Sequence, residues 1–110
     1  MSSQRALEVA TLEGARSLGL SNSVGSLAPG KKADLITVAL SDINLTVPTD
    51  IPGLLTLAAQ PQNIKDVMIG GRLLKKDGHL VDIDLAGIKS NAEQSLQYLL
   101  SKSGWEITLN

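Results

Sequence analysis

The residue best suited to acid–base chemistry in this sequence is its single histidine, His79, which follows Asp77 and Gly78. A histidine titrates near neutral pH and can act as a general base, and the Asp77 carboxylate could orient its ring. The alternative is a histidine at the surface of a hairpin. We favour the second interpretation, because nothing else in the sequence supplies a nucleophile or an oxyanion site around the ring.

A segment containing glycines and lysines, residues 25–32, superficially suggests a phosphate-binding loop. That loop needs Ser or Thr after its lysine, a strand before it and a helix after it, whereas here we expect a helix before and a strand after. We therefore predict a simple turn at Pro29 and Gly30. The pairs Lys31–Lys32 and Lys75–Lys76 also lie at predicted turns, where solvated charge is the ordinary explanation.

Two carboxylates, Asp82 and Asp84, lie two residues apart at the start of a predicted helix. One can cap the helix and the other can complement its dipole, which accounts for both without catalysis. The absence of cysteine removes thiolate chemistry and cysteine-based metal sites, and one histidine cannot form a histidine cluster. We therefore assign no catalytic, cofactor-binding or metal-binding residue and expect no cofactor.

The composition bounds the remaining possibilities. The chain has 110 residues, of which 43% are hydrophobic, so we predict a single domain over residues 1–110. Its 10 Lys and Arg against 11 Asp and Glu lack the basic surface of a nucleic-acid binder, and with no Phe, one Trp and one Tyr it lacks a base-stacking platform. No signal peptide or membrane-spanning run occurs, and we expect a soluble, cytoplasmic protein.

The elements that position these residues begin with a helix over residues 3–18, where small and apolar side chains recur at spacings of three and four. Gly14 and Ala15 would let another backbone segment come close, and Gly19 has the place of a left-handed C-terminal residue. The narrow apolar stripe of this helix includes Leu7, Ala10, Gly14 and Leu18.

Strands are predicted in the second half of the chain. Residues 34–40 are rich in β-branched side chains and predict a strand buried on both faces, or nearly so, followed by a loop over 41–52 and two helical turns over 53–59. Residues 66–81 predict a three-stranded meander with turns at 70–71 and 75–78.

The C-terminal part predicts a second helix and a last strand. Asp84 is the predicted N-cap of a helix that continues to about Ser101, with Ile83 and Ile88 as its hydrophobic staple. Residues 105–109 alternate and could form a terminal strand. The expected fold class is α+β, a small β-sheet flanked by an N-terminal and a C-terminal helix.

Three ordered motifs, over residues 6–20, 24–36 and 66–78, resemble the C-terminal end of the metal-dependent amidohydrolase superfamily, especially its branch of nucleobase and adenosyl-type deaminases and triazine hydrolases. The resemblance implies that the small sheet is part of a composite β-sandwich built jointly from the N- and C-terminal residues of such enzymes. It also implies a (β/α)₈ barrel that binds Zn²⁺ or Fe²⁺ and activates water for attack on a C–N bond.

None of the family's metal or catalytic positions lies in the matching stretch, so the resemblance carries no site residue to this chain. Family members have about four hundred residues, and this chain corresponds to the part that begins at the last barrel helix. We therefore expect the apolar stripe of that helix and the open strand edges to be uncovered.

Two functional readings follow. In the first, the chain is a truncated amidohydrolase-like protein, inactive alone, that homodimerises through the 3–18 helix or a strand edge; alternatively, the helix over 84–101 folds back over that surface and gives a monomer. In the second, the chain is a structural subunit of a split C–N bond hydrolase and completes a separate barrel subunit. A small-ligand binding module is a third possibility without positive sequence support.

Overall fold

The N-terminal helix has the predicted bounds to within one residue. In the computed structural model, which describes residues 1–47 and 49–106, it comprises α1 (Ser3–Glu8), the π-helical turn η1 (Val9–Glu13) and α2 (Gly14–Ser17). The Ser2 hydroxyl caps it by accepting from the Arg5 N–H at 3.2 Å. Gly19 has a φ of +70°, and the Leu20 N–H donates to the Ala15 carbonyl at 2.8 Å. This is the predicted left-handed ending.

A loop returns from this helix to the sheet and approaches the helix closely. A Cβ added to Gly25 would lie 2.6 Å from the Cβ of Ala15, so the small residue on each side is required. This contact confirms the expected close approach at Ala15. The turn at Pro29 and Gly30 is also confirmed, since Gly30 has a φ of +86° and the Lys31 N–H donates to the Ala28 carbonyl at 3.1 Å.

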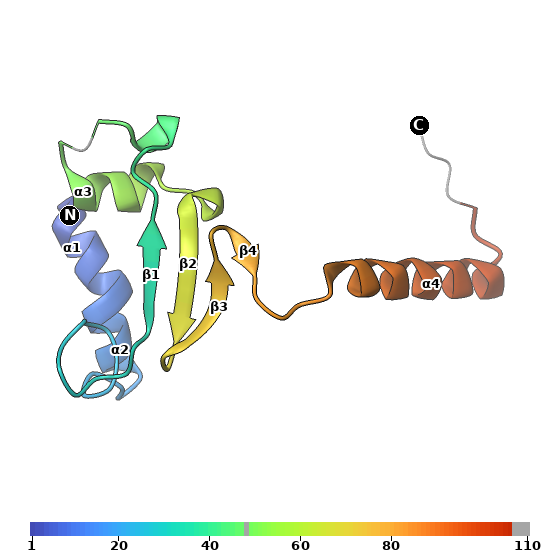
Figure 1. Ribbon diagram of the computed structural model, residues 1–110, viewed down its shortest axis with the longest axis horizontal. Helices are drawn as coiled ribbons and strands as arrows, with labels where there is room; N and C mark the ends of the chain where they lie inside the picture. The colour runs from blue at the N-terminus through green and yellow to red at the C-terminus, as the bar shows by residue number, and fades with distance from the viewer. Residues whose placement is uncertain (48, 107–110) are drawn as a thin grey trace.

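The sheet is an antiparallel meander of four strands in the order β1 (Leu35–Val38), β2 (Ile64–Ile69), β3 (Arg72–Lys76) and β4 (His79–Leu80), as Figure 1 shows. The last three strands confirm the predicted meander, but its second turn is shorter than the predicted one over 75–78, because Lys75 and Lys76 pair with Leu80 and His79 as part of β3. Two-residue turns connect them, at 70–71 and at 77–78, and all four turn residues have positive φ. This geometry matches the right-handed twist of the strands.

Strand β1 corrects one expectation. Ile36 is 54% exposed and Thr37 is exposed, so the strand is not buried on both faces as the sequence predicted. The physical reason is the position of β1 at the edge of the sheet, where only β2 pairs with it. A β-branched run therefore marked a strand here without marking its burial.

Short helical turns connect β1 to β2: η2 (Ile43–Leu45), α3 (Ile51–Gly53), η3 (Leu54–Ala58) and η4 (Pro61–Asn63). They confirm the predicted helical turns over 53–59, although helix begins within the predicted loop. Leu45 and Asn63 are fully buried here. The Asn63 amide donates to the Asp42 carboxylate at 2.8 Å and accepts from the Gln60 N–H and from the Asn44 amide, each at 2.8 Å.

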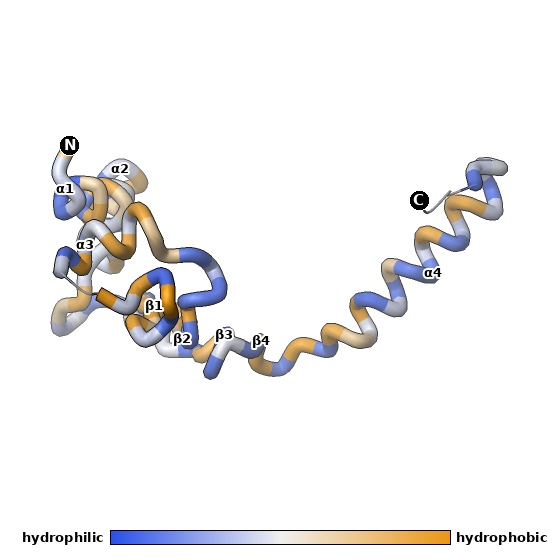
Figure 2. The backbone as a smooth tube through the Cα atoms, turned by 90° about the horizontal axis from the view of Figure 1, so that it is seen from above, coloured by the Kyte–Doolittle hydropathy of each residue, from blue (hydrophilic) through white to orange (hydrophobic). Residues whose placement is uncertain are grey.

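The C-terminal helix α4 (Leu85–Ser103) leaves the sheet after β4 and points away from it (Figures 1 and 2). The Asp84 carboxylate accepts from the Gly87 N–H at 2.9 Å, which confirms the predicted cap, and Gly104 ends the helix with a φ of +69°. The helix does not fold back over the N-terminal helix. Of the predicted strand over 105–109, residues 107–109 lie outside the described residues, and Trp105 and Glu106 belong to no strand.

The described part of the chain is thus a small α+β fold with a projecting helix. None of its helices combines the length and apolar character that crossing a membrane requires.

Candidate functional site

His79 lies on β4 with its side chain exposed. Its Nδ1 is 2.9 Å from the main-chain carbonyl oxygen of Asp77, to which a protonated Nδ1 donates. The ring therefore contacts the backbone of its own turn. The general-base hypothesis needed a contact between the ring and the Asp77 carboxylate, which is not the group that the ring contacts. The geometry is that of a histidine on a surface hairpin.

Asp66 holds together three parts of the sheet, a role the sequence did not reveal. Its carboxylate accepts from the Thr37 hydroxyl of β1 at 2.5 Å and from the Asp77 N–H of the β3–β4 turn at 3.0 Å. The Thr37 hydrogen bond, followed by the one from Asp77, lowers the pKa of Asp66 below its usual value. A carboxylate in the middle of an apolar strand was the available signal.

Lys31 corrects the expectation of a solvated lysine pair. Its Nζ donates to the Ser21 carbonyl at 2.5 Å and to the Ser26 hydroxyl at 2.8 Å, and lies 3.3 Å from the Val24 carbonyl. The ammonium group therefore joins the residues after the Pro29–Gly30 turn to the loop over residues 21–26. Lys32 remains exposed.

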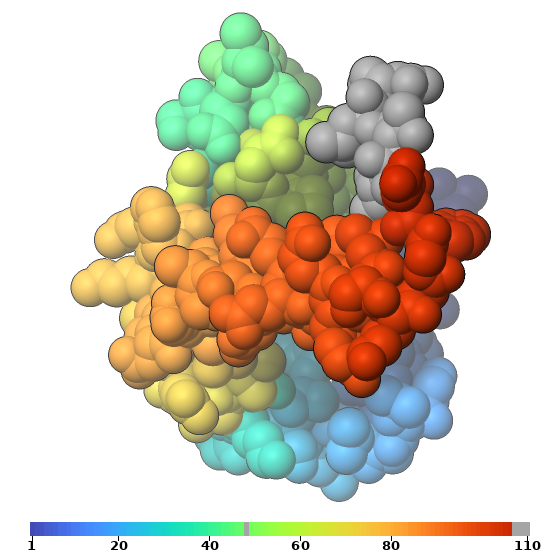
Figure 3. Space-filling model, turned by 90° about the vertical axis from the view of Figure 1, so that its right-hand side faces the viewer, coloured from blue at the N-terminus to red at the C-terminus, as the bar shows by residue number. Residues whose placement is uncertain are grey.

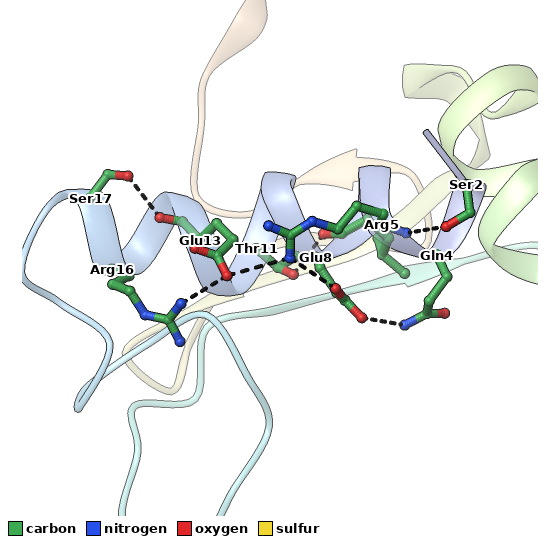
Figure 4. A network of polar contacts seen from close by, with 9 residues as sticks. Ser2, Gln4, Arg5, Glu8, Thr11, Glu13, Arg16 and Ser17 are labelled. Atoms are coloured by element: carbon green, nitrogen blue, oxygen red, sulfur yellow. Dashed lines mark hydrogen bonds and ion pairs between the residues drawn. The ribbon is translucent and has the colours of Figure 1, made fainter.

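The charged side chains of the N-terminal helix form a network on its solvent side, shown in Figure 4. The Arg5 guanidinium lies 3.2 Å from the Glu8 carboxylate and 3.5 Å from that of Glu13, and Arg16 lies 2.8 Å from Glu13. The hydrogen bond to Glu8 raises the pKa of Arg5, and hydrogen bonds from Gln4 and then Arg5 lower the pKa of Glu8. These exposed side chains form ion pairs with one another. The apolar stripe lies on a different side of the helix.

The residues present do not fit a hydrolase metal centre. Within residues 1–47 and 49–106 no three His, Cys, Asp or Glu side chains come together in a group that could hold a metal ion. A catalytic zinc or iron site takes about three such protein ligands. The chain's only histidine is a surface residue of β4, and its carboxylates are dispersed.

The feature that remains is an open apolar groove of about 700 Å³. One wall is the N-terminal helix over 10–18, the other is the loop over 20–27, and β1 and β2 form the floor. Ile36 and Leu18, which line it, are 54% and 74% exposed. The predicted uncovered stripe is therefore one wall of a groove whose floor and second wall the sequence did not reveal.

A second uncovered apolar surface lies on α4. Nearly every side chain of this helix is exposed, and its polar and apolar residues alternate along the tube in Figure 2. In Figure 3 the helix stands in front of the rest of the molecule. At 100° per residue its larger apolar side chains fall on one side, and we define the α4 stripe as Leu85, Ile88, Ala92, Leu96 and Leu99.

The accessible surface is larger than that of a compact monomer. The accessible area is 8580 Å², whereas a compact monomer of this mass exposes about 5,800 Å². The radius of gyration is 19.8 Å, against about 13 Å for a compact chain of this length. Ala15 and Leu45 are the buried hydrophobic residues of the described part. The chain therefore exposes about 2,700 Å² more surface than a compact monomer of its mass.

Known proteins are similar to this chain in both sequence and fold. The sequence profile of the amidohydrolase family matches residues 1–74. A 5-methylthioadenosine/S-adenosylhomocysteine deaminase of Moorella thermoacetica is 40% identical over 80 residues, which are 73% of this chain and 19% of that protein. An S-triazine hydrolase of Gordonia rubripertincta is 32% identical over 67% of this chain and 16% of its own length.

A crystal structure of an adenosine deaminase from Xanthomonas campestris with bound zinc superposes with a TM-score of 0.81 and 33% identity, over 91% of this chain and 23% of that one. The match leaves about a tenth of this chain unpaired. The chain spans about a fifth of the length of the relatives it matches.

Proposed function

This chain belongs to the amidohydrolase family, and we propose that it forms the structural C-terminal part of such a fold, without a catalytic centre of its own. In this proposal strands β1 to β4 are its share of the composite β-sandwich beside the barrel, and residues 1–110 act as one domain. The parent activity is metal-dependent hydrolysis of a C–N bond, the reaction class of deaminases.

The observation that carries the proposal is the state of the titratable side chains. His79 is bound to its own turn, Asp66 to Thr37 and a backbone N–H, and the helix carboxylates to arginines. Each therefore has a structural partner, and activating water at neutral pH needs a metal ion or a positioned base. The uncovered apolar surface supports self-association, as a homodimer, and the cytoplasm stays the predicted location.

The test measures metal and turnover on the same purified chain. After extensive dialysis we expect well below one equivalent of zinc or iron by elemental analysis. A panel of aminopyrimidines, aminopurines and aminotriazines should release no ammonia above buffer. A stoichiometric metal that resists chelators, or turnover that His79→Ala abolishes, would contradict the proposal.

A second candidate function is that of a structural subunit that completes a separately encoded barrel. The favouring observation is that this chain superposes on 23% of a solved zinc-containing deaminase with a TM-score of 0.81. Co-expression with a polypeptide that supplies the other four fifths of an amidohydrolase tests it. Zinc binding and ammonia release that need both polypeptides support the subunit, and a barrel polypeptide equally active alone contradicts it.

A further inference from the structure

The chain carries two uncovered apolar surfaces that its own topology keeps apart. The groove lies on β1 and β2, beside the N-terminal helix. The α4 stripe leaves the molecule after β4, at the opposite edge of the sheet, and points away (Figure 1). One molecule of this shape cannot cover its own groove with its own stripe.

We propose that α4 of one copy lies in the groove of a second copy, and that the second copy's α4 lies in the groove of the first. This inference rests on the self-association part of the proposed function and names the surfaces that carry it. Stripe and groove are different surfaces, so a single contact between copies would leave one of each free and permit a chain of molecules. Reciprocal exchange closes the pair with two-fold symmetry.

The two surfaces match in size and character. Helix α4 has 19 residues and is about 28 Å long, and the 15 residues from Ser3 to Ser17 give the helix beside the groove a length of about 22 Å. The floor and walls of the groove are mainly apolar, with Asp34 as the charged residue among the described lining. Most helices in proteins gain their stability from packing of an amphipathic face, which α4 would obtain in the groove of the second copy.

The area favours exchange over the simpler pairings. The excess over a compact monomer is about 2,700 Å² for each chain and therefore about 5,400 Å² for a pair, which reaches the upper end of the roughly 2,000–5,000 Å² or more that obligate dimers bury in total. Pairing of α4 with α4, or of two N-terminal helices, would cover one surface and leave the other in water. Exchange covers both surfaces on each chain.

Cysteine cross-linking tests the proposed contact directly, because the chain contains no cysteine. The variants Leu96→Cys, in the α4 stripe, and Ile36→Cys, on the groove floor, are purified separately, mixed, and treated with a short bismaleimide. We expect a covalent dimer in the mixture at a yield at least tenfold above that of either variant alone. Gln94→Cys, on the opposite side of α4, is the matched control and should give no such excess when mixed with Ile36→Cys.

Light scattering provides the second measurement. The chain should have a mass near twice 11.6 kDa, Leu96→Asp should raise the dimer dissociation constant at least tenfold, and Gln94→Asp should leave it unchanged. A dimer that persists in Leu96→Asp, or Leu96→Cys that cross-links mainly to itself, overturns the exchange while self-association stands. A monomer at micromolar concentration overturns both, and metal and ammonia assays on that sample still test the non-catalytic role.

Discussion

The sheet with its helices, residues 3–80, and the projecting helix α4 differ in what holds them in place. The first region contains buried contacts between parts of the chain that are distant in sequence, as where Asn63 joins the η2 and η4 turns. In α4 both ends are fixed by adjacent residues, Asp84 at the start and Gly104 at the end, while its sides contact almost nothing. Local signals therefore define where a helix begins and ends without defining what it packs against.

The largest effect should come from breaking the buried polar contacts of the first region. Asn63 is fully buried, and Asn63→Ala would leave the Gln60 N–H, the Asn44 amide and the Asp42 carboxylate without this partner. We expect the free energy of unfolding to fall by about 3 kcal/mol. Urea titration followed by circular dichroism, at one protein concentration, measures it.

Gln62→Ala, an exposed neighbour in the same turn, is the control and should change the free energy of unfolding by less than about 0.5 kcal/mol. Equal effects of the two substitutions would show that Asn63 does not hold the turns together.

The contact between the loop and the N-terminal helix should give the next effect. Gly25 and Gly30 have nearly the same φ, +88° and +86°, but only a Cβ at Gly25 would meet Ala15. Gly25→Ala should therefore lower the free energy of unfolding by about 1–3 kcal/mol more than Gly30→Ala. Chemical denaturation of both variants gives the difference, and Ala15→Gly should restore part of it. Equal losses would contradict the close packing.

A smaller effect should be confined to α4. Asp84→Ala removes the carboxylate that accepts from the Gly87 N–H and should destabilise the start of the helix by about 1 kcal/mol. Hydrogen exchange should accelerate in the first turn of α4 and stay unchanged in β2. Asp84→Ser keeps an N-cap acceptor and should exchange like the unmodified chain. Faster exchange throughout the sheet would show that the two regions are coupled.

The smallest effect is the pH dependence contributed by Asp66. Its pKa is lower in the folded chain than in the unfolded one, so its stabilisation is present above the unfolded pKa and is lost as the pH falls through the folded value, below about 4. The stability difference between the unmodified chain and Asp66→Asn should therefore shrink on acidification from pH 7 to pH 3. Thermal melts across this range measure it, and a constant difference would exclude the carboxylate as its source.

The features that could be predicted from the sequence are those that depend on residues close together in the chain. The turn at Gly70 and Gly71, the cap at Asp84 and the helix end at Gly19 each depend on residues a few positions apart, and all three are confirmed. The exposure of Ile36 and the buried contacts of Asn63 depend on segments about 20 to 30 residues away, for which the sequence carried no signal.

The groove likewise has parts that could be predicted from the sequence and parts that could not. The helical wall of the groove followed from side-chain spacing in the N-terminal helix, whereas the loop wall needs the lysine contacts of Lys31, and the floor needs the pairing of β1 with β2. The sequence also gave no signal for the direction in which α4 projects, because no residue of the connection over 81–84 encodes a packing partner.

The two-residue turns of the meander also bear on the order in which the sheet assembles. Strands β2, β3 and β4 follow one another over residues 64–80 with only two-residue turns between them, and hairpins of this kind close within about 10 μs. Pairing of β1 with β2 must first bring together segments separated by roughly 25 residues, which costs additional loop-closure entropy. We expect β1 to join last and to detach first, so that the groove whose floor it shares exists only in the completely folded sheet.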